Sequence, residues 1–137
     1  MKRLLKKKIN LITDQDKNKI DIQRSPEVVY GLRNFIGNAV KFSKEEINIS
    51  IESDKKKAKI IINDDGEGFA EDIKNNLGEP YIKSKSNNEN SGTGLGTFLG
   101  KTLLERRGAK LNFSNGGALK GAKVTISWNV LDLENQN

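Results

Sequence analysis

Two stretches of the chain repeat apolar residues at the spacing of an amphipathic helix. The first follows Ser25, Pro26 and Glu27, which supply a hydroxyl N-cap, a proline at the first helical position and an acid in the first turn. The second should span Leu95 to Arg107 and end at Gly108 as its C-terminal cap. The first helix should run to about Phe42, with Phe35 and Phe42 along one flank of an apolar side made by Val29, Leu32, Ile36, Ala39 and Val40.

Other stretches alternate apolar and polar residues as strands do. The clearest are residues 47–51, 60–62, 111–113 and 124–130. The first two flank a charged turn and predict an antiparallel pair, and the last two predict strands joined by a glycine-rich turn. Residues 6–12 and 19–24 alternate more weakly and predict a short hairpin. Helices on one face of a mixed, mainly antiparallel sheet give an α/β (α+β) two-layer sandwich as the predicted fold class.

Length and composition narrow this picture. The 137 residues suit one domain, with residues 1–24 as an N-terminal strand segment, residues 25–130 as the main body and residues 131–137 as a polar tail. The formal net charge is +6, but much of the excess lies at the N-terminus and in the turn at residues 55–57, which favours solvated charge over nucleic-acid binding. The chain has no cysteine and no histidine, which excludes a thiolate nucleophile, a disulfide and a histidine base or metal ligand within it. No apolar run approaches the roughly 18 residues that span a bilayer.

Asn34, Asn38 and Lys41 fall within an arc of roughly 60° on the first predicted helix. They would form one polar stripe that faces outward, opposite the apolar side. Such a stripe is usually solvated, but asparagine is a poor helix former and a solvated face would usually carry Glu, Lys or Gln. Two amide oxygens beside a cation suit a hydrated magnesium ion and the phosphates it accompanies. On the helix alone, solvation and ligand binding both stay open.

Asp64, Gly66 and Gly68 stand at the end of the predicted strand around residues 60–62, in the sequence Asp-Asp-Gly-Glu-Gly. The glycines allow positive φ or close backbone approach, and the carboxylate can accept a hydrogen bond from an exocyclic amine such as the N6 of adenine. An ordinary Asp/Gly turn or a fragment of a Ca²⁺ loop would explain the same residues, although the further ligands of an EF-hand are missing.

A second glycine cluster, at residues 92–96, comes immediately before the second predicted helix. Free amides opening onto a helix N-terminus suit phosphate. The dinucleotide pattern fails because the third glycine comes one residue early, and a P-loop fails because only three residues separate Gly96 from Gly100. Residues 70–76 predict a short helix, and the polar residues 78–93 predict either an idle surface loop or a binding lid.

These three features occur in order along the chain, about 30 residues apart, and the combination is far more specific than any part. It resembles the ATP-binding superfamily of gyrase, the heat-shock chaperone ATPases, histidine kinases and MutL. NFIGNAVKFS looks like the N box, DDGEG the first glycine box, EPYI a degenerate phenylalanine box and GTGLG the second glycine box. Within the superfamily, the chain resembles the catalytic ATP-binding domain of sensor histidine kinases, and GLGTFLGKTLLERRGAKLNFSN looks like the redox-responsive sensor kinases of the Reg/Prr type.

The resemblance implies roles for the candidate residues, with ATP and Mg²⁺ as cofactors. Asn38, with Asn34, would ligate Mg²⁺, and Lys41 would contact phosphate oxygens, so Asn34 and Lys41 are the implied catalytic residues. Asp64 would receive the adenine amino group, in a pocket shaped by Gly66 and Gly68. The loop at residues 80–96 would close over the triphosphate. The remaining implied nucleotide contacts are Tyr81, Gly92, Thr93, Gly94, Leu95, Gly96 and, through water, Thr125.

The same resemblance implies a histidine kinase whose phosphoacceptor lies elsewhere, because this chain has no histidine. We expect an excised cytoplasmic domain of a longer, homodimeric inner-membrane sensor, with a histidine-bearing dimerisation domain and a response regulator as partners. This chain itself should contact neither membrane nor nucleic acid. The alternatives are an ATP hydrolase or a serine kinase of the same fold, or a non-catalytic nucleotide-binding module. A hydrolase is disfavoured because its usual glutamate base would stand where Asn34 is found.

Overall fold

The computed structural model describes residues 7–13, 25–69 and 95–130. The hairpin partner predicted at residues 19–24, the short helix at 70–76 and the loop at 78–93 lie outside the described residues. The described elements are β1 (Lys8–Thr13), α1 (Pro26–Phe42), β2 (Glu46–Ser53), β3 (Lys57–Asp64), α3 (Leu95–Arg106), β4 (Lys110–Asn115) and β5 (Ala122–Asn129).

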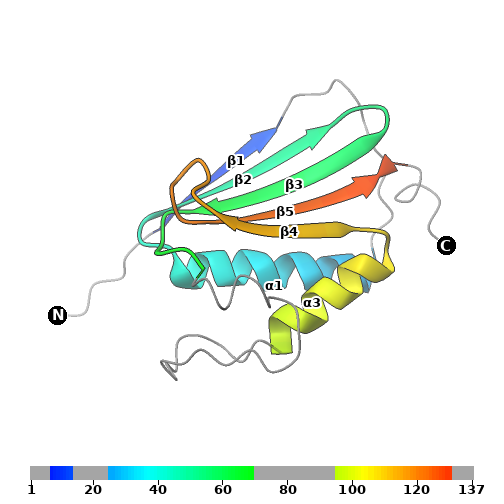
Figure 1. Cartoon of the computed structure of the whole chain (residues 1–137), viewed down its shortest axis with the longest axis horizontal. Helices are drawn as coiled ribbons and strands as arrows, with labels where there is room; N and C mark the ends of the chain where they lie inside the picture. The colour runs from blue at the N-terminus through cyan, green and yellow to red at the C-terminus, as the bar shows by residue number, and fades with distance from the viewer. Residues whose placement is uncertain (1–6, 14–24, 70–94, 131–137) are drawn as a thin grey trace.

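The described strands form one mixed sheet in the order β1-β2-β3-β5-β4, and α1 and α3 both lie on the same face of it (Figure 1). β2 and β3 pair antiparallel, as the isoleucine alternation predicts, with Ile49 opposite Ile62 and Ile51 opposite Ile60. β5 lies between β3 and β4 and is antiparallel to both. The predicted two-layer α/β sandwich is confirmed.

The N-terminal strand has a neighbour that the hairpin prediction does not include. β1 pairs with β2, in parallel, with Ile9 opposite Ile47 and Leu11 opposite Ile49. Lys7 fastens the start of this strand to the end of α1, because its ammonium donates to the carbonyls of Val40 at 2.6 Å and Ser43 at 2.8 Å. Local alternation predicts a strand there, but it carries no information about a neighbour more than 30 residues away.

Cap residues explain where α1 begins and where α3 ends. The Ser25 hydroxyl accepts from the backbone N–H of Val28 at 3.1 Å, as its N-cap position predicts. At the end of α3, Gly108 takes φ 90°, and the N–H groups of Gly108 and Ala109 donate to the carbonyls of Glu105 and Leu104. These two bonds are the Schellman pattern, in which a left-handed glycine satisfies the last carbonyls of a helix.

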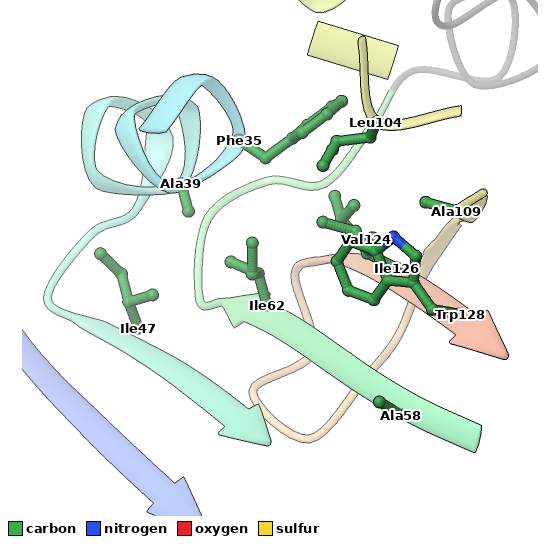
Figure 2. Packing of buried hydrophobic residues seen from close by; sticks show 10 residues of the cluster. All are labelled: Phe35, Ala39, Ile47, Ala58, Ile62, Leu104, Ala109, Val124, Ile126 and Trp128. Atoms are coloured by element: carbon green, nitrogen blue, oxygen red, sulfur yellow. The ribbon is translucent and has the colours of Figure 1, made fainter. Parts of the chain in front are cut away.

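The core lies between the sheet and the two helices, and Phe35 enters it from α1 (Figure 2). Phe35 is 3% exposed, whereas Phe42, placed on the same flank by the sequence, is 43% exposed. α1 therefore turns the stripe of Gly31, Phe35 and Ala39 inward, and Leu32 and Ile36 are only partly buried. The reason is α3: a Cβ on Gly31 would lie 2.4 Å from Leu104 Cγ, so the two helices pack closely at that glycine.

Candidate functional site

A cleft of about 220 Å³ opens between α1 and the end of the sheet at which β3 and β4 finish and β5 begins. Most of its wall is apolar and aromatic, with a few polar groups, which is the usual character of a small-molecule site. Its lining residues are Phe35, Asn38, Ala39, Phe42, Ile62, Asp64, Glu67, Gly68, Phe69, Thr97, Phe113, Ala122 and Val124. Asn38, Asp64 and Gly68, which the sequence singles out in two separate motifs, thus share one cavity.

Asp64 ends β3 and is 6% exposed. Its Oδ1 accepts from the backbone N–H of Gly66 at 2.9 Å and of Ala122 at 3.1 Å. Both hydrogen bonds that the described residues donate to this carboxylate end on Oδ1, which leaves Oδ2 as an acceptor for a donor in the cleft. A carboxylate oriented in this way can accept a hydrogen bond from a donor such as an amino group.

Asn38 approaches the cleft from α1, where it is half-buried. Its Nδ2 donates to the hydroxyl of Thr97 on α3 at 3.3 Å. The amide is thereby oriented, and its Oδ1 accepts no hydrogen bond from the described residues. A neutral oxygen is a suitable ligand for a hard cation that brings its own anions.

Glycines let three backbone segments meet around Asp64. A Cβ on Gly66 would lie 2.2 Å from the carbonyl oxygen of Phe42, and one on Gly121 would lie 2.4 Å from the carbonyl oxygen of Asp64. Gly68 takes φ 84°, where a side chain would be strained. The end of α1, the segment after β3 and the β4–β5 turn therefore converge at one end of the sheet (Figure 1).

Asp65, beside Asp64, fastens this segment to the turn between α1 and β2. Its carboxylate accepts from the backbone N–H groups of Lys44, Glu45 and Glu46 at 2.7 to 3.2 Å. Desolvation by itself raises the pKa of Asp65, but the donors from Glu45, Lys44 and Glu46 together hold that pKa below its ordinary value. From the sequence, Asp65 is predicted only as part of a turn.

Asn34 and Lys41 do not accompany Asn38 into the cleft. A Cβ on Gly100 would lie 3.3 Å from Asn34 Cβ, so Asn34 faces α3, and its Oδ1 is buried without a hydrogen-bond partner among the described residues. Lys41 is exposed, with its ammonium 5.3 Å from the ring centroid of Phe42. The predicted stripe with one outward orientation is therefore incorrect, because α3 packs over one edge of it.

Thr125 also lies away from the cleft. On β5 the residues Ala122, Val124 and Ile126 are buried towards the helices, so Thr125 points to the opposite face of the sheet. Ala122 takes its place at the cleft, through its backbone N–H to Asp64. The alternation that predicts Val124 and Ile126 as core residues already contained this information.

The other predicted nucleotide contacts lie at the margin of the described residues or outside them. Tyr81, Gly92, Thr93 and Gly94 are outside. Leu95 and Gly96 form the start of α3, as the predicted helix requires. Gly100, Lys101 and Thr102, the residues of the near-miss P-loop, lie within α3, where Gly100 is buried against α1.

The aromatic residues that line the cleft were not predicted from the sequence. Phe69 and Phe113 meet edge to face, with centroids 6.1 Å apart, and Phe113 meets Phe35 at 5.8 Å. The Asn115 amide clasps the backbone of Phe69, accepting from its N–H at 2.7 Å and donating to its carbonyl at 2.8 Å. Apolar residues on alternating strand positions are ordinary core signals, so nothing local marks them as pocket residues.

The described residues contain no group of three or more His, Cys, Asp or Glu side chains that could hold a metal ion by themselves. The donor set instead fits Mg²⁺ brought in with phosphates, since this ion keeps several waters and needs only one or two protein oxygens. Asn38 Oδ1 is such an oxygen.

Comparison with protein families matches residues 24–132 to the histidine kinase-, DNA gyrase B- and HSP90-like ATPases. The chain belongs to this family. Membership implies that this ATPase domain binds ATP. Sensor histidine kinase RegB of Cereibacter sphaeroides is 43% identical to the domain over 101 residues, which are 69% of this chain and 22% of RegB. The chain thus spans about a fifth of the length of this relative.

Solved structures show the same fold for this ATPase domain. The catalytic domain of histidine kinase ThkA matches with a TM-score of 0.72 at 21% identity, over 89% of this chain and 79% of that one. A mycobacterial sensor histidine kinase, MprB, matches with a TM-score of 0.69 at 20% identity, over 89% of this chain and 82% of that one. Among the described residues, no helix has the length and apolar character needed to cross a membrane.

Proposed function

We propose that this ATPase domain is the catalytic domain of a sensor histidine kinase. It binds Mg²⁺-ATP and transfers the γ-phosphate to a histidine on a dimerisation domain. One observation carries the proposal: Asn38 of α1 and Asp64 of β3, which come from separate motifs, line the same cleft. The similarity to RegB supports a kinase over the other members of the family.

The base of ATP would occupy the aromatic end of the cleft. There Asp64 Oδ2 would accept a hydrogen bond from the N6 amino group of adenine, while Oδ1 stays bound to the N–H groups of Gly66 and Ala122. Guanine carries a carbonyl at the corresponding position, so a buried carboxylate acceptor would reject it. Phe69 and Phe113 would provide apolar contact for the ring.

The phosphates would extend towards Asn38 and the start of α3. Asn38 Oδ1 would ligate Mg²⁺. Lys41, which is exposed with its ammonium 5.3 Å from the ring centroid of the cleft residue Phe42, would contact phosphate oxygens. Asn34, one turn earlier, is the second proposed ligand; its orphaned Oδ1 would need to turn from α3 to reach the ion. When bound, Mg²⁺ would neutralise the charge that develops on the phosphates during transfer.

Transfer to a protein acceptor is preferred over hydrolysis for a chemical reason. Phosphoryl transfer asks the protein mainly for positioning and charge neutralisation. Hydrolysis needs in addition a group that activates water, and the residue one turn before Asn38 is Asn34, a neutral amide without basic character. The acceptor histidine must come from outside these 137 residues, because none of them is histidine.

The full-length protein is proposed to be a homodimeric sensor of the Reg/Prr type, located in the inner membrane and responsive to redox conditions. Its partners would be a dimerisation domain that carries the histidine and a response regulator that receives the phosphate. The basis is the 43% identity to sensor histidine kinase RegB, which covers the ATPase domain only.

The test mixes the chain with Mg²⁺-ATP labelled in the γ-phosphate and a separately made histidine-bearing dimerisation domain. Acid-labile, base-stable phosphate should form on the dimerisation domain. The Asn38→Ala and Asp64→Asn variants should lose it. The first lacks the Mg²⁺ ligand; in the second, the N–H groups of Gly66 and Ala122 hold the amide oxygen, so an NH₂ donor faces the amino group of adenine. The Asn112→Ala variant, altered at an exposed position of β4, should label the partner like the original chain.

The other outcomes would redirect the assignment. Acid-stable phosphate on serine would indicate a serine kinase, and phosphate release without labelling would indicate a hydrolase. Binding of ATP with neither reaction would indicate a nucleotide-binding module.

A further inference from the structure

The segment that leaves β3 is held from two sides before it lines the cleft. On one side Asp65 binds the turn between α1 and β2. On the other side the last residue of β4, Asn115, reaches across to Phe69. Asp65 acts where the backbone enters the segment, whereas Asn115 acts directly on two cleft residues, Gly68 and Phe69.

Asn115 bonds both polar atoms of the Phe69 backbone, at 2.7 Å to the N–H and 2.8 Å to the carbonyl. This amide pair imitates one rung of a β-ladder, so it fixes the position and the rotation of residue 69. The contact also explains Gly68: a Cβ there would lie 2.8 Å from Asn115 Oδ1, in addition to the strain at φ 84°. The position of the Asn115 amide and the absence of a side chain at residue 68 are therefore compatible.

The same strand also holds the ring of Phe69. Phe113 is two residues before Asn115 on β4, so both side chains leave the strand on the same face. Phe113 meets the Phe69 ring edge to face at 6.1 Å while Asn115 holds its backbone. Phe69 is thereby oriented as a wall of the cleft, next to Asp64.

We propose that Asn115 is a positioning residue for the nucleotide base: by clasping the backbone of Phe69, it fixes the wall against which the base packs beside Asp64. The inference rests on the proposed ATP site. Asn115 lines no part of the cleft and acts through Phe69 and Gly68. Its effect is confined to the base end, because the Asn38 end is built from α1 and α3.

The experiment measures the dissociation constants of ATP and ADP for the 137-residue chain by calorimetry, with and without Mg²⁺. Asn115→Ala should weaken both nucleotides by about tenfold, since a mobile wall must be ordered on binding. The ratio of the constants with and without Mg²⁺ should not change. Asn38→Ala should instead change mainly this ratio, by reducing the gain in affinity that Mg²⁺ provides.

Asn112→Ala is the matched control, because it removes the same side chain from the same strand on the opposite face, where Asn112 is exposed. It should bind both nucleotides like the original chain. A second comparison uses Phe69→Ala with and without Asn115→Ala. Since Asn115 acts through Phe69, adding Asn115→Ala to Phe69→Ala should cost much less than tenfold.

Asn115→Asp serves as the second variant if Asn115→Ala fails to fold, as judged by circular dichroism. It keeps an acceptor for the Phe69 N–H but places a carboxylate against the carbonyl, so it should also weaken both nucleotides. Unchanged binding in folded variants, full additivity with Phe69→Ala, or a changed Mg²⁺ ratio would overturn the positioning role alone. Absence of ATP binding by the original chain would instead overturn the proposed function, and this role with it.

Discussion

Two turns at opposite ends of β3 are each organised by an aspartate carboxylate, but they differ in where that carboxylate finds its donors. In the hairpin before β3, Asp54 accepts from the N–H groups of Lys56 and Lys57, two and three residues away. In the segment after β3, Asp65 accepts from Lys44, Glu45 and Glu46, 19 to 21 residues away. The carboxylate of the first turn finds its donors within three residues, whereas the carboxylate of the second turn depends on a distant segment.

The difference teaches where function is built. The hairpin closes locally and lies away from the cleft, as an ordinary surface turn does. The segment after β3 carries Asp64 and Gly68, and distant residues hold it at Gly66, Asp65 and Phe69. A binding site needs groups kept at fixed distances from one another, and long-range contacts provide that rigidity.

The largest expected effect comes from Gly66→Ala. The new Cβ would meet the Phe42 carbonyl oxygen at 2.2 Å, so either the segment or the end of α1 must shift. We expect a loss of about 3 kcal/mol in the free energy of unfolding, measured by urea denaturation, together with weaker ATP binding. The control is Gly37→Ala, where nothing lies within 4 Å. That variant should gain up to about 1 kcal/mol, because alanine favours a helix interior. Equal effects at the two glycines would contradict the close approach at Gly66.

Removing each carboxylate in turn compares the two turns directly. Asp65→Ala leaves the N–H groups of Lys44, Glu45 and Glu46 without their acceptor and frees the segment that carries Asp64. We expect a lower melting temperature and weaker ATP binding. Asp54→Ala should lower the melting temperature less and leave ATP affinity unchanged. The measurements are thermal denaturation and calorimetry, and a loss of affinity in Asp54→Ala would remove the distinction.

Acidification should weaken the contacts of both carboxylates. The pKa of Asp54 lies below its ordinary value because Lys57 and Lys56 donate to it; the pKa of Asp65 is likewise lowered, because its backbone donors outweigh desolvation. A lowered folded-state pKa means stability that is complete above the ordinary value of 3.8 and is lost as pH falls through the lower folded value. Unfolding midpoints from pH 5 to pH 2 should therefore fall. Asp65→Asn and Asp54→Asn should each flatten that fall, and unaltered profiles would contradict these contacts.

The smallest effect is expected for the hairpin itself. Replacing Lys55 and Lys56 by serine removes two exposed cations and keeps the backbone N–H groups that donate to Asp54. The free energy of unfolding should change by no more than about 0.5 kcal/mol, and ATP affinity should not change. Denaturation and calorimetry on this variant test whether the hairpin is as independent of the cleft as its contacts indicate.

Much of the fold could be predicted because its signals are local. Ser25 and Gly108 mark a helix start and a helix end through hydrogen bonds within a few residues. The isoleucines of β2 and β3 predict paired strands because the turn between them is short. The pairing of β1 with β2 could not be predicted, since parallel strands are joined by a distant crossover.

The candidate site also contains residues that could be predicted from the sequence and residues that could not. Asn38 and Asp64 could be chosen as candidates from residue type and spacing, and Thr125 could have been excluded by the alternation of its strand. Asn34 could not have been excluded from the sequence, because its orientation depends on the packing of α3 against α1 at Gly100. Asn115 gives no sequence signal, since a single asparagine at the end of a strand is common.

The sequence by itself determined which segments are helices and strands, where α1 begins, where α3 ends, and which residue types could bind a nucleotide, because each depends on neighbours within a few residues. Only the tertiary structure decided that Asn38 and Asp64 face one cleft, that Asn34 turns to α3 and that Asn115 holds Phe69. These facts depend on contacts between segments far apart in the chain, and such contacts are fixed by the packing of the whole core.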